Sequence, residues 1–267
     1  MILSGVIGLA GGIAAVILKS TVHYIQTTLS DFREDVAHYL FLIYPLIGIV
    51  ITSIVADKLL KEKLGHGITS ILYTISKKSS IITRIKTYSS MITSALTVGF
   101  GGSVGLEAPI VVTGSALGSN IGQLMHLSYK QRTLMIGCGA AAAISGIFNS
   151  PVAGVIFSIE VILTDVTIAA FIPLLIASVI GSLVSMLTLG SDVLFSFNLT
   201  DPFLASDFPY FLVLGALCGL VSVYFTRLTQ FTESVAVKIK NKTGRAIFGG
   251  LALGIIIFVF HPIYGEG

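Results

Sequence analysis

Residues 101–112, GGSVGLEAPIVV, interrupt an otherwise apolar region with glycines, a proline and one acid. Glu107 is the only Asp, Glu, Lys or Arg from Thr87 to Tyr129. A carboxylate so isolated either caps a helix at an exposed surface or works at a site away from bulk water. The residues on both sides of this stretch help to decide between an exposed helix cap and a site away from water.

The composition is that of a membrane protein. Hydrophobic residues make up 54% of the 267 residues and charged residues only 11%, whereas soluble domains carry roughly 25% charged residues. Several apolar runs approach or exceed the roughly 20 residues that a helix needs to cross a bilayer, which predicts a polytopic helical bundle. The runs are 2–18, 39–56, 89–106, 108–125, 133–159, 166–190, 209–225 and 246–260.

Charge and cysteine usage argue against several classes of function. The net charge of +3 is modest and the basic residues lie in short loops, so nucleic-acid binding is not indicated. The cysteines, Cys138 and Cys218, lie in apolar runs, and there is no CxxC pair or His/Cys cluster of the kind that holds a metal. We therefore expect no cofactor and no metal. An intramembrane enzyme that uses Glu107 or Glu160 as general acid or base is a rival, but no nucleophile or metal-ligand set accompanies them.

The first spans recur late in the sequence. VIGLAGGIAAV (6–16) aligns with VLGALCGLVSV (213–223), which sets Gly8 on Gly215 and Gly12 on Gly219. PLIGIVI (45–51) likewise aligns with LALGIII (251–257). We assign 1–205 to a first repeat and 206–267 to the start of a second, incomplete one. This assignment predicts that the chain is a fragment of a longer protein.

The loops between the paired spans differ in charge. The loop at 31–38 carries three acids and one base, whereas the loop at 238–245 carries four bases and no acid. Basic loops stay cytoplasmic, so the two copies are expected to cross the membrane in opposite directions, as inverted repeats do. Segments 58–63 and 77–86 are also expected inside, and the acidic segment 192–207 outside.

The region 65–151 does not fit simple spans. GHGITSILYTIS (65–76) is too short to cross, and GGSVGLEAP and GIFNSPVAG (146–154) interrupt apolar runs. Such segments indicate discontinuous helices that line a cavity or are buried in protein. Pro109 suits the first turn of a helix. Free N–H groups at that turn, with the positive end of the macrodipole, make an anion site without a formal positive charge.

Glu107 then lies where an anion would bind. Its carboxylate can occupy the site in competition with a permeant anion, and protonation would remove that competition, so the side chain can act as a pH-responsive gate. The alternative is a helix cap at the membrane surface, but the absence of nearby charges and the broken segments favour the gate. Glu160 either serves a proton path, pairs with a neighbour or faces the interface. His66 is either a turn residue satisfied by backbone or a ligand.

These motifs resemble those of the CLC family of chloride channels and chloride/proton exchangers. GLEAP (105–109) is similar to the family's GREGP, IFNSPVAGVIFSIE (147–160) to AFNAPLAGILFxIE, and GHGIT (65–69) to GSGIP. The resemblance implies an all-α polytopic membrane protein with inverted-topology repeats and broken helices, truncated here in the second repeat. It also implies a homodimer with one pore per subunit.

The resemblance further implies the residues of the site. Glu107 would be the gating glutamate. His66 stands where the family usually has Ser, and Val161 stands where exchangers typically carry a second, internal glutamate. The implied anion-binding residues are Gly105, Leu106, Glu107, Ala108, Pro109, His66, Gly67 and Ile68.

From these features we predict voltage- or pH-gated transport of chloride or a similar small anion by a multi-pass protein of the cell membrane. Val161 favours channel-like conduction, with chloride as the transported ion and the lipid bilayer and a second copy of the chain as partners. The alternatives are a chloride/proton or fluoride/proton antiporter, and a transporter of another solute on an inverted-repeat fold.

Overall fold

The protein is described by a computed structural model that covers residues 1–31, 37–60, 67–163, 168–190, 204–239 and 241–260. Within these ranges every regular element is a helix, which confirms the predicted all-α class. In chain order the elements are α1 (Ile2–Asp31), α2 (Ala37–Ile54), η1 (Val55–Leu60), α3 (Gly67–Lys77), α4 (Lys86–Gly99), α5 (Glu107–Leu124), α6 (Tyr129–Phe148), α7 (Pro151–Phe157), η2 (Ser158–Ile162), α8 (Ile168–Leu189), η3 (Ala205–Asp207), α9 (Phe208–Val237) and α10 (Lys242–Val259). The elements η1 and η2 are π-helices and η3 is a 3₁₀-helix.

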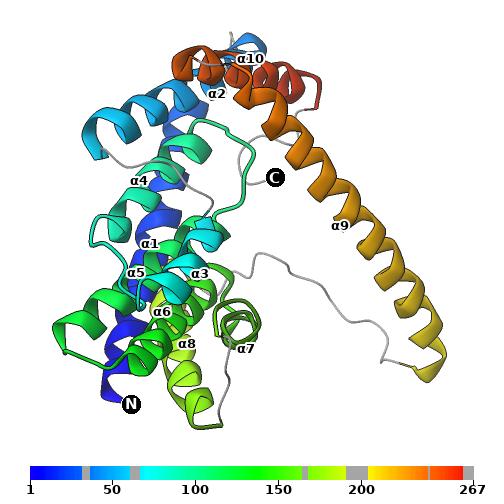
Figure 1. The fold of residues 1–267 in the computed structure, drawn as a ribbon. Coiled ribbons are helices and arrows are strands. Elements are labelled where there is room, and N and C mark those ends of the chain that lie inside the picture. The colour runs from blue at the N-terminus through cyan, green and yellow to red at the C-terminus, as the bar shows by residue number, and fades with distance from the viewer. Residues whose placement is uncertain (32–36, 61–66, 164–167, 191–203, 240, 261–267) are drawn as a thin grey trace.

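Helix α6 forms the centre of the core and contacts α1, α5, α7 and α8 (Figure 1). All of its residues from 135 to 147 are buried, and the four consecutive alanines at 140–143 have no exposed surface. Small residues at helix contacts let backbones approach closely, which is how helices associate where lipid removes the hydrophobic driving force. The alanine- and glycine-rich sequence of α6 therefore explains why so many helices can pack around it.

Glycines make the contact between α5 and α6 especially close. A Cβ placed on Gly139 of α6 would overlap the carbonyl oxygen of Gly114 on α5 and lie 2.6 Å from its carbonyl carbon. A Cβ on Gly118 would similarly lie 2.6 Å from the carbonyl carbon of Met135. The two backbones therefore touch without intervening side chains, and α5 is held in a fixed position against the core.

Four helices among the described residues are long and apolar enough to cross a membrane. They span Ile2–Leu29, Ile168–Leu189, Phe208–Val237 and Lys242–Val259. Helices α3 and α7, of 11 and 7 residues, are much shorter than the roughly 20 residues that a crossing requires. Short helices thus lie beside full spans, as the interrupted apolar runs predict.

The apolar run at 133–159 is broken at the predicted place. Helix α6 ends at Phe148, and Asn149 adopts the left-handed conformation with φ 52° and ψ 33°, a conformation that Asn tolerates better than most residues. Ser150 is extended and Pro151 then begins α7. The Asn-Ser-Pro sequence therefore turns one apolar run into two helices.

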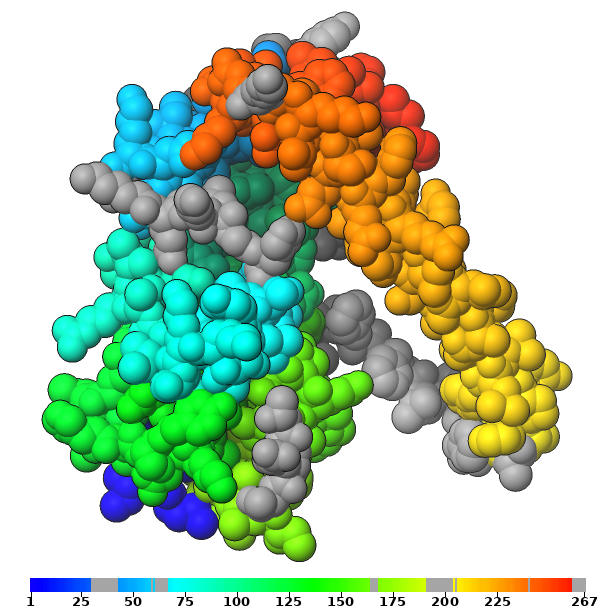
Figure 2. Space-filling view, viewed as in Figure 1, coloured from blue at the N-terminus to red at the C-terminus, as the bar shows by residue number. Residues whose placement is uncertain are grey.

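Helix α9 extends away from the other helices as a long arm, and none of its residues is buried (Figures 1 and 2). Helix α10, which follows it, packs against α2. A Cβ placed on Gly250 of α10 would lie 2.8 Å from the Cα of Leu46 on α2, so these two helices are in close contact. The C-terminal helix pair is thereby joined to the rest of the fold through α2.

Candidate functional site

The chain reverses direction between α4 and α5 through glycines. Gly101 has a φ of 87°, a conformation that residues with a Cβ rarely adopt. The N–H of Gly102 donates to the carbonyl oxygen of Thr97 at 2.8 Å, and a Cβ on Gly102 would lie 2.6 Å from that same oxygen. These two glycines are therefore required to end α4 and to begin α5 in its position.

The first turn of α5 has no side-chain cap. Leu106, the N-cap residue, is buried and contributes no side-chain hydrogen bond. The N–H of Ile110 donates to the carbonyl oxygen of Leu106 at 3.1 Å, and Pro109 has no N–H to donate. The N–H groups of Glu107 and Ala108 precede this first bond, so they lie at the positive end of the helix in the geometry that binds anions.

The carboxylate of Glu107 folds back over Gly105. A Cβ placed on Gly105 would overlap one carboxylate oxygen of Glu107 and lie 2.7 Å from its carboxyl carbon. The missing side chain of Gly105 thus leaves the space in which this carboxylate lies, at the start of its own helix.

The first turn of α3 meets the first turn of α5. A Cβ placed on Gly67 would lie 3.3 Å from the Cβ of Ala108. Ile68 packs with its side chain against the hydrophobic core. The structure therefore brings Gly67 next to the segment 105–109. His66 lies outside the described residues.

Lys86 is a charged residue near this site that the sequence pattern placed in a cytoplasmic loop. It opens α4 and is half-buried, and its Nζ donates to Ser70 Oγ at 3.1 Å. Ser70 Oγ in turn donates to the carbonyl oxygen of Gly67 at 2.8 Å. A cation therefore contacts the first turn of α3. The signal in the sequence is that Lys86 is the last base before the charge-free stretch around Glu107.

A polar cluster holds the segment between α3 and α4 against α5. Ser119 Oγ donates to the carbonyl oxygen of Ser80 at 2.7 Å and accepts from the N–H of Ile82 at 3.0 Å. Gln123 Nε2 also donates to the carbonyl oxygen of Ile82 at 3.2 Å. Because these bonds link the segment after α3 to the second half of α5, they hold that segment in place against α5.

Glu160 lies on the π-helix η2 and is exposed. Within the described ranges, no hydrogen bond or ion pair joins its carboxylate to another residue, and Asp165, its neighbour in sequence, is outside those ranges. The structure does not bring Glu160 into contact with the first turns of α3 and α5.

Under the anion transport that the sequence predicts, Gly105→Ala is expected to raise anion flux about threefold at neutral pH, because a methyl group would displace the Glu107 carboxylate from the space it occupies. The backbone at this position is not in the left-handed region, so alanine is compatible with it. Efflux from liposomes measures the effect, with Val104→Ala in the same exposed loop as the control. An unchanged flux would show that the carboxylate does not block the site from this position.

Several known proteins are similar in sequence to this chain. A family model described as voltage gated chloride channel matches residues 47–267. Chloride channel protein CLC-f of Arabidopsis thaliana is 34% identical over 216 residues, which cover 74% of this chain and 28% of that protein. The H(+)/Cl(-) exchange transporter ClcA of Vibrio cholerae is 25% identical over 269 residues, which cover 95% of this chain and 56% of that protein. The chain thus spans less than two thirds of the length of these relatives.

Solved structures share the fold. A slow cyanobacterial Cl-/H+ antiporter superposes with a TM-score of 0.86 at 18% identity, over 100% of this chain and 65% of its own. A CLC-type fluoride/proton antiporter superposes with a TM-score of 0.79 at 25% identity, over 97% of this chain and 65% of its own. The break between α4 and α5 and the short helices α3 and α7 are therefore part of a fold that is also found in solved antiporters.

Proposed function

The chain belongs to the voltage-gated chloride channel family, and we propose that it moves chloride or a similar small anion across a membrane at the meeting point of α3 and α5. The observation that carries this proposal is the contact of two helix first turns, Gly67 of α3 against Ala108 of α5, with the Glu107 carboxylate folded back at the uncapped start of α5. Backbone N–H groups at helix starts attract anions without a fixed cationic ligand. An anion bound there can also leave, which transport requires.

In this proposal Glu107 is the gate, and the anion-binding residues are those predicted from the sequence. The carboxylate over Gly105 occupies the positive end of α5 as a substitute anion. When it is protonated it no longer competes, and a permeant anion takes its place. Lys86, through Ser70, adds positive potential at the first turn of α3 and supports anion entry from that side.

Channel-like conduction is our preferred mode. Val161, at the position where a second glutamate would assist proton movement, is an apolar residue packed against the hydrophobic core. Proton-coupled exchange is the second candidate, because the two solved structures are a Cl-/H+ and a fluoride/proton antiporter. In that case Glu160 on η2 is the candidate for the proton path. The proposed role is transport and not catalysis, and it requires no cofactor.

The proposed organisation is an inverted repeat, with 1–205 as the first copy and 206–267 as the start of the second. Helices α1 and α9 both have 30 residues, and α2 and α10 both have 18. Equal lengths in the same order support the repeat. We place the protein in the cell membrane as a homodimer, with the loop before α10 on the cytoplasmic side because it is basic.

Reconstitution into liposomes separates the two modes of transport. With a chloride gradient imposed across the membrane and no proton gradient, channel-like conduction is expected to dissipate chloride without moving protons uphill. Stoichiometric uphill proton movement would contradict the channel preference and support exchange. A fluoride gradient in place of the chloride gradient tests which halide is carried, and flux of neither anion would contradict the proposed function.

A further inference from the structure

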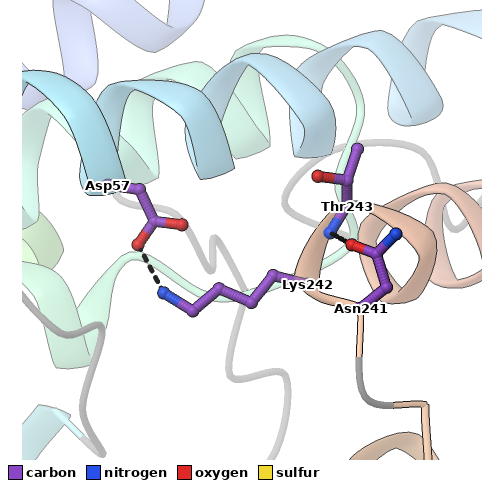
Figure 3. Close-up of polar contacts among 4 residues, drawn as sticks. All are labelled: Asp57, Asn241, Lys242 and Thr243. Carbon is purple, nitrogen blue, oxygen red and sulfur yellow. Dashed lines mark hydrogen bonds and ion pairs between the residues drawn. The ribbon is translucent and has the colours of Figure 1, made fainter.

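A cavity of about 610 Å³ lies between α2, η1, α4 and α10, apart from the residues of the proposed anion site. Its charged lining residues are Asp57 on η1 and Lys242 and Arg245 on α10. Lys242 Nζ donates to Asp57 Oδ1 at 2.8 Å, so the side chain of Lys242 reaches from the start of α10 to η1 (Figure 3). The cavity thus lies where the C-terminal helix pair joins the rest of the fold.

Arg245 lines the cavity from α10. Its Nη2 donates to the carbonyl oxygen of Ile239 at 3.0 Å, which fixes the direction of the guanidinium group. The guanidinium is always charged, so it supplies positive potential to this end of the cavity.

The start of α10 adds further donors. Asn241 Oδ1 accepts from the N–H of Thr243 at 3.1 Å (Figure 3), and the N–H of Arg245 donates to the carbonyl oxygen of Asn241 at 2.9 Å. The backbone N–H groups of Lys242 and Gly244 belong to the first turn of α10, where N–H groups have no acceptor within the helix. Two cationic side chains and a helix start therefore meet at one end of the cavity, an arrangement that suits phosphate.

Away from these charges the cavity is lined by uncharged residues, which are Ile49, Thr52, Ser53 and Thr97. Ile49 lies eight positions before Asp57, or about 12 Å along a helix at 1.5 Å per residue. The hydroxyl groups of Thr52 and Thr97 bond to each other at 3.1 Å and so are less available to a ligand. The lining thus changes from charged to uncharged along one direction.

We infer that this cavity binds the phosphate group of an anionic lipid, with Lys242 and Arg245 as its ligands. The uncharged end suits the part of the lipid that adjoins the headgroup. Basic pockets between helices on the cytoplasmic side bind lipid headgroups, and the basic loop before α10 indicates that side. Asp57 competes with the phosphate for Lys242. Removal of Asp57 and removal of Lys242 therefore have opposite effects on binding.

Native mass spectrometry of the purified protein with dioctanoyl phosphatidic acid tests this inference. Lys242→Gln and Arg245→Gln are each expected to reduce lipid retention about fivefold, and Asp57→Asn is expected to increase it. Lys238→Gln is the matched control, because Lys238 is a base of the same loop that does not line the cavity. The side chains of Lys242 and Asp57 are 71% and 43% exposed, and exposed pairs contribute little to stability, so the Lys242→Gln and Asp57→Asn variants are expected to fold.

Two further experiments test whether the ligand lies in the cavity and whether it is a lipid or free phosphate. Ala246→Leu, which fills part of the cavity, is expected to reduce retention without any change in charge. Inorganic phosphate at the same concentration as the lipid is expected to displace little of it, and full displacement would overturn the lipid source. Equal losses in Lys238→Gln and Lys242→Gln, or reduced retention in Asp57→Asn, would overturn the site itself.

Discussion

Replacement of Glu107 by Gln is expected to raise anion flux at neutral pH about tenfold, the gain that follows if the carboxylate occupies the anion position about nine-tenths of the time. In the unaltered protein, flux is expected to rise as the pH falls, because protonation neutralises the carboxylate over Gly105. Glutamine has the same shape and carries no charge at any pH. The variant should therefore lose the pH response together with the block.

Chloride efflux from liposomes over a series of pH values measures both effects. Asp207→Asn is the control for loss of one carboxylate, because Asp207 lies on η3 and accepts from the N–H of Leu204 at 3.1 Å, outside the proposed site. This control is expected to keep the pH response. A Glu107→Gln variant whose flux still changes with pH would contradict the assignment of Glu107 as the gate.

Gly139→Ala is expected to destabilise the protein by about 3 kcal/mol, at the upper end of the range for overpacking. The added methyl group would overlap the carbonyl oxygen of Gly114, and backbone atoms cannot move aside as a flexible side chain can. Separation of α5 from α6 is the remaining way to relieve the overlap. Since stabilities are typically 5–15 kcal/mol, a large part of the total would be lost. The midpoint of thermal unfolding in detergent measures this loss.

Gly219→Ala is the matched control for Gly139→Ala. Gly219 lies on α9, and a Cβ there would have no atom within 4 Å. Both substitutions gain the same intrinsic helix propensity, about 1 kcal/mol, so their difference isolates the contact between α5 and α6. Equal unfolding midpoints for the two variants would mean that this contact is looser than the structure describes.

The breaks in the helices could be predicted from the sequence because glycine, asparagine and proline act on their own backbone. The positive φ of Gly101, the left-handed Asn149 and the helix starts near Pro109 and Pro151 all follow from local constraints. The isolation of Glu107 was equally visible, because a charge-free stretch of this length is rare outside membranes. From these features the sequence predicts a broken helix with an isolated carboxylate at its start.

The arrangement of the site depends on contacts between distant segments, which the sequence pattern does not record. Gly67 meets Ala108, and Lys86 reaches Ser70, across separate elements, and the bonds of Ser119 help to hold α5 against the segment before α4. The π-helical form of η1 and η2 also has no recognisable sequence signal in these apolar runs. Periodicity and composition predict single elements, whereas the site requires several elements to be placed together.

The close contact of α5 with α6 also determines which part of the proposed gate can move. Because the backbones touch at Gly114 and Gly139, α5 cannot shift without α6, and the moving part in the proposed mechanism is one side chain. Exposed side chains change rotamer in picoseconds to nanoseconds, whereas collective helix motions take microseconds to milliseconds. In the proposed mechanism, the time for which the gate stays closed is then set by the arrival of a proton or an anion, and not by slow motions of the helices.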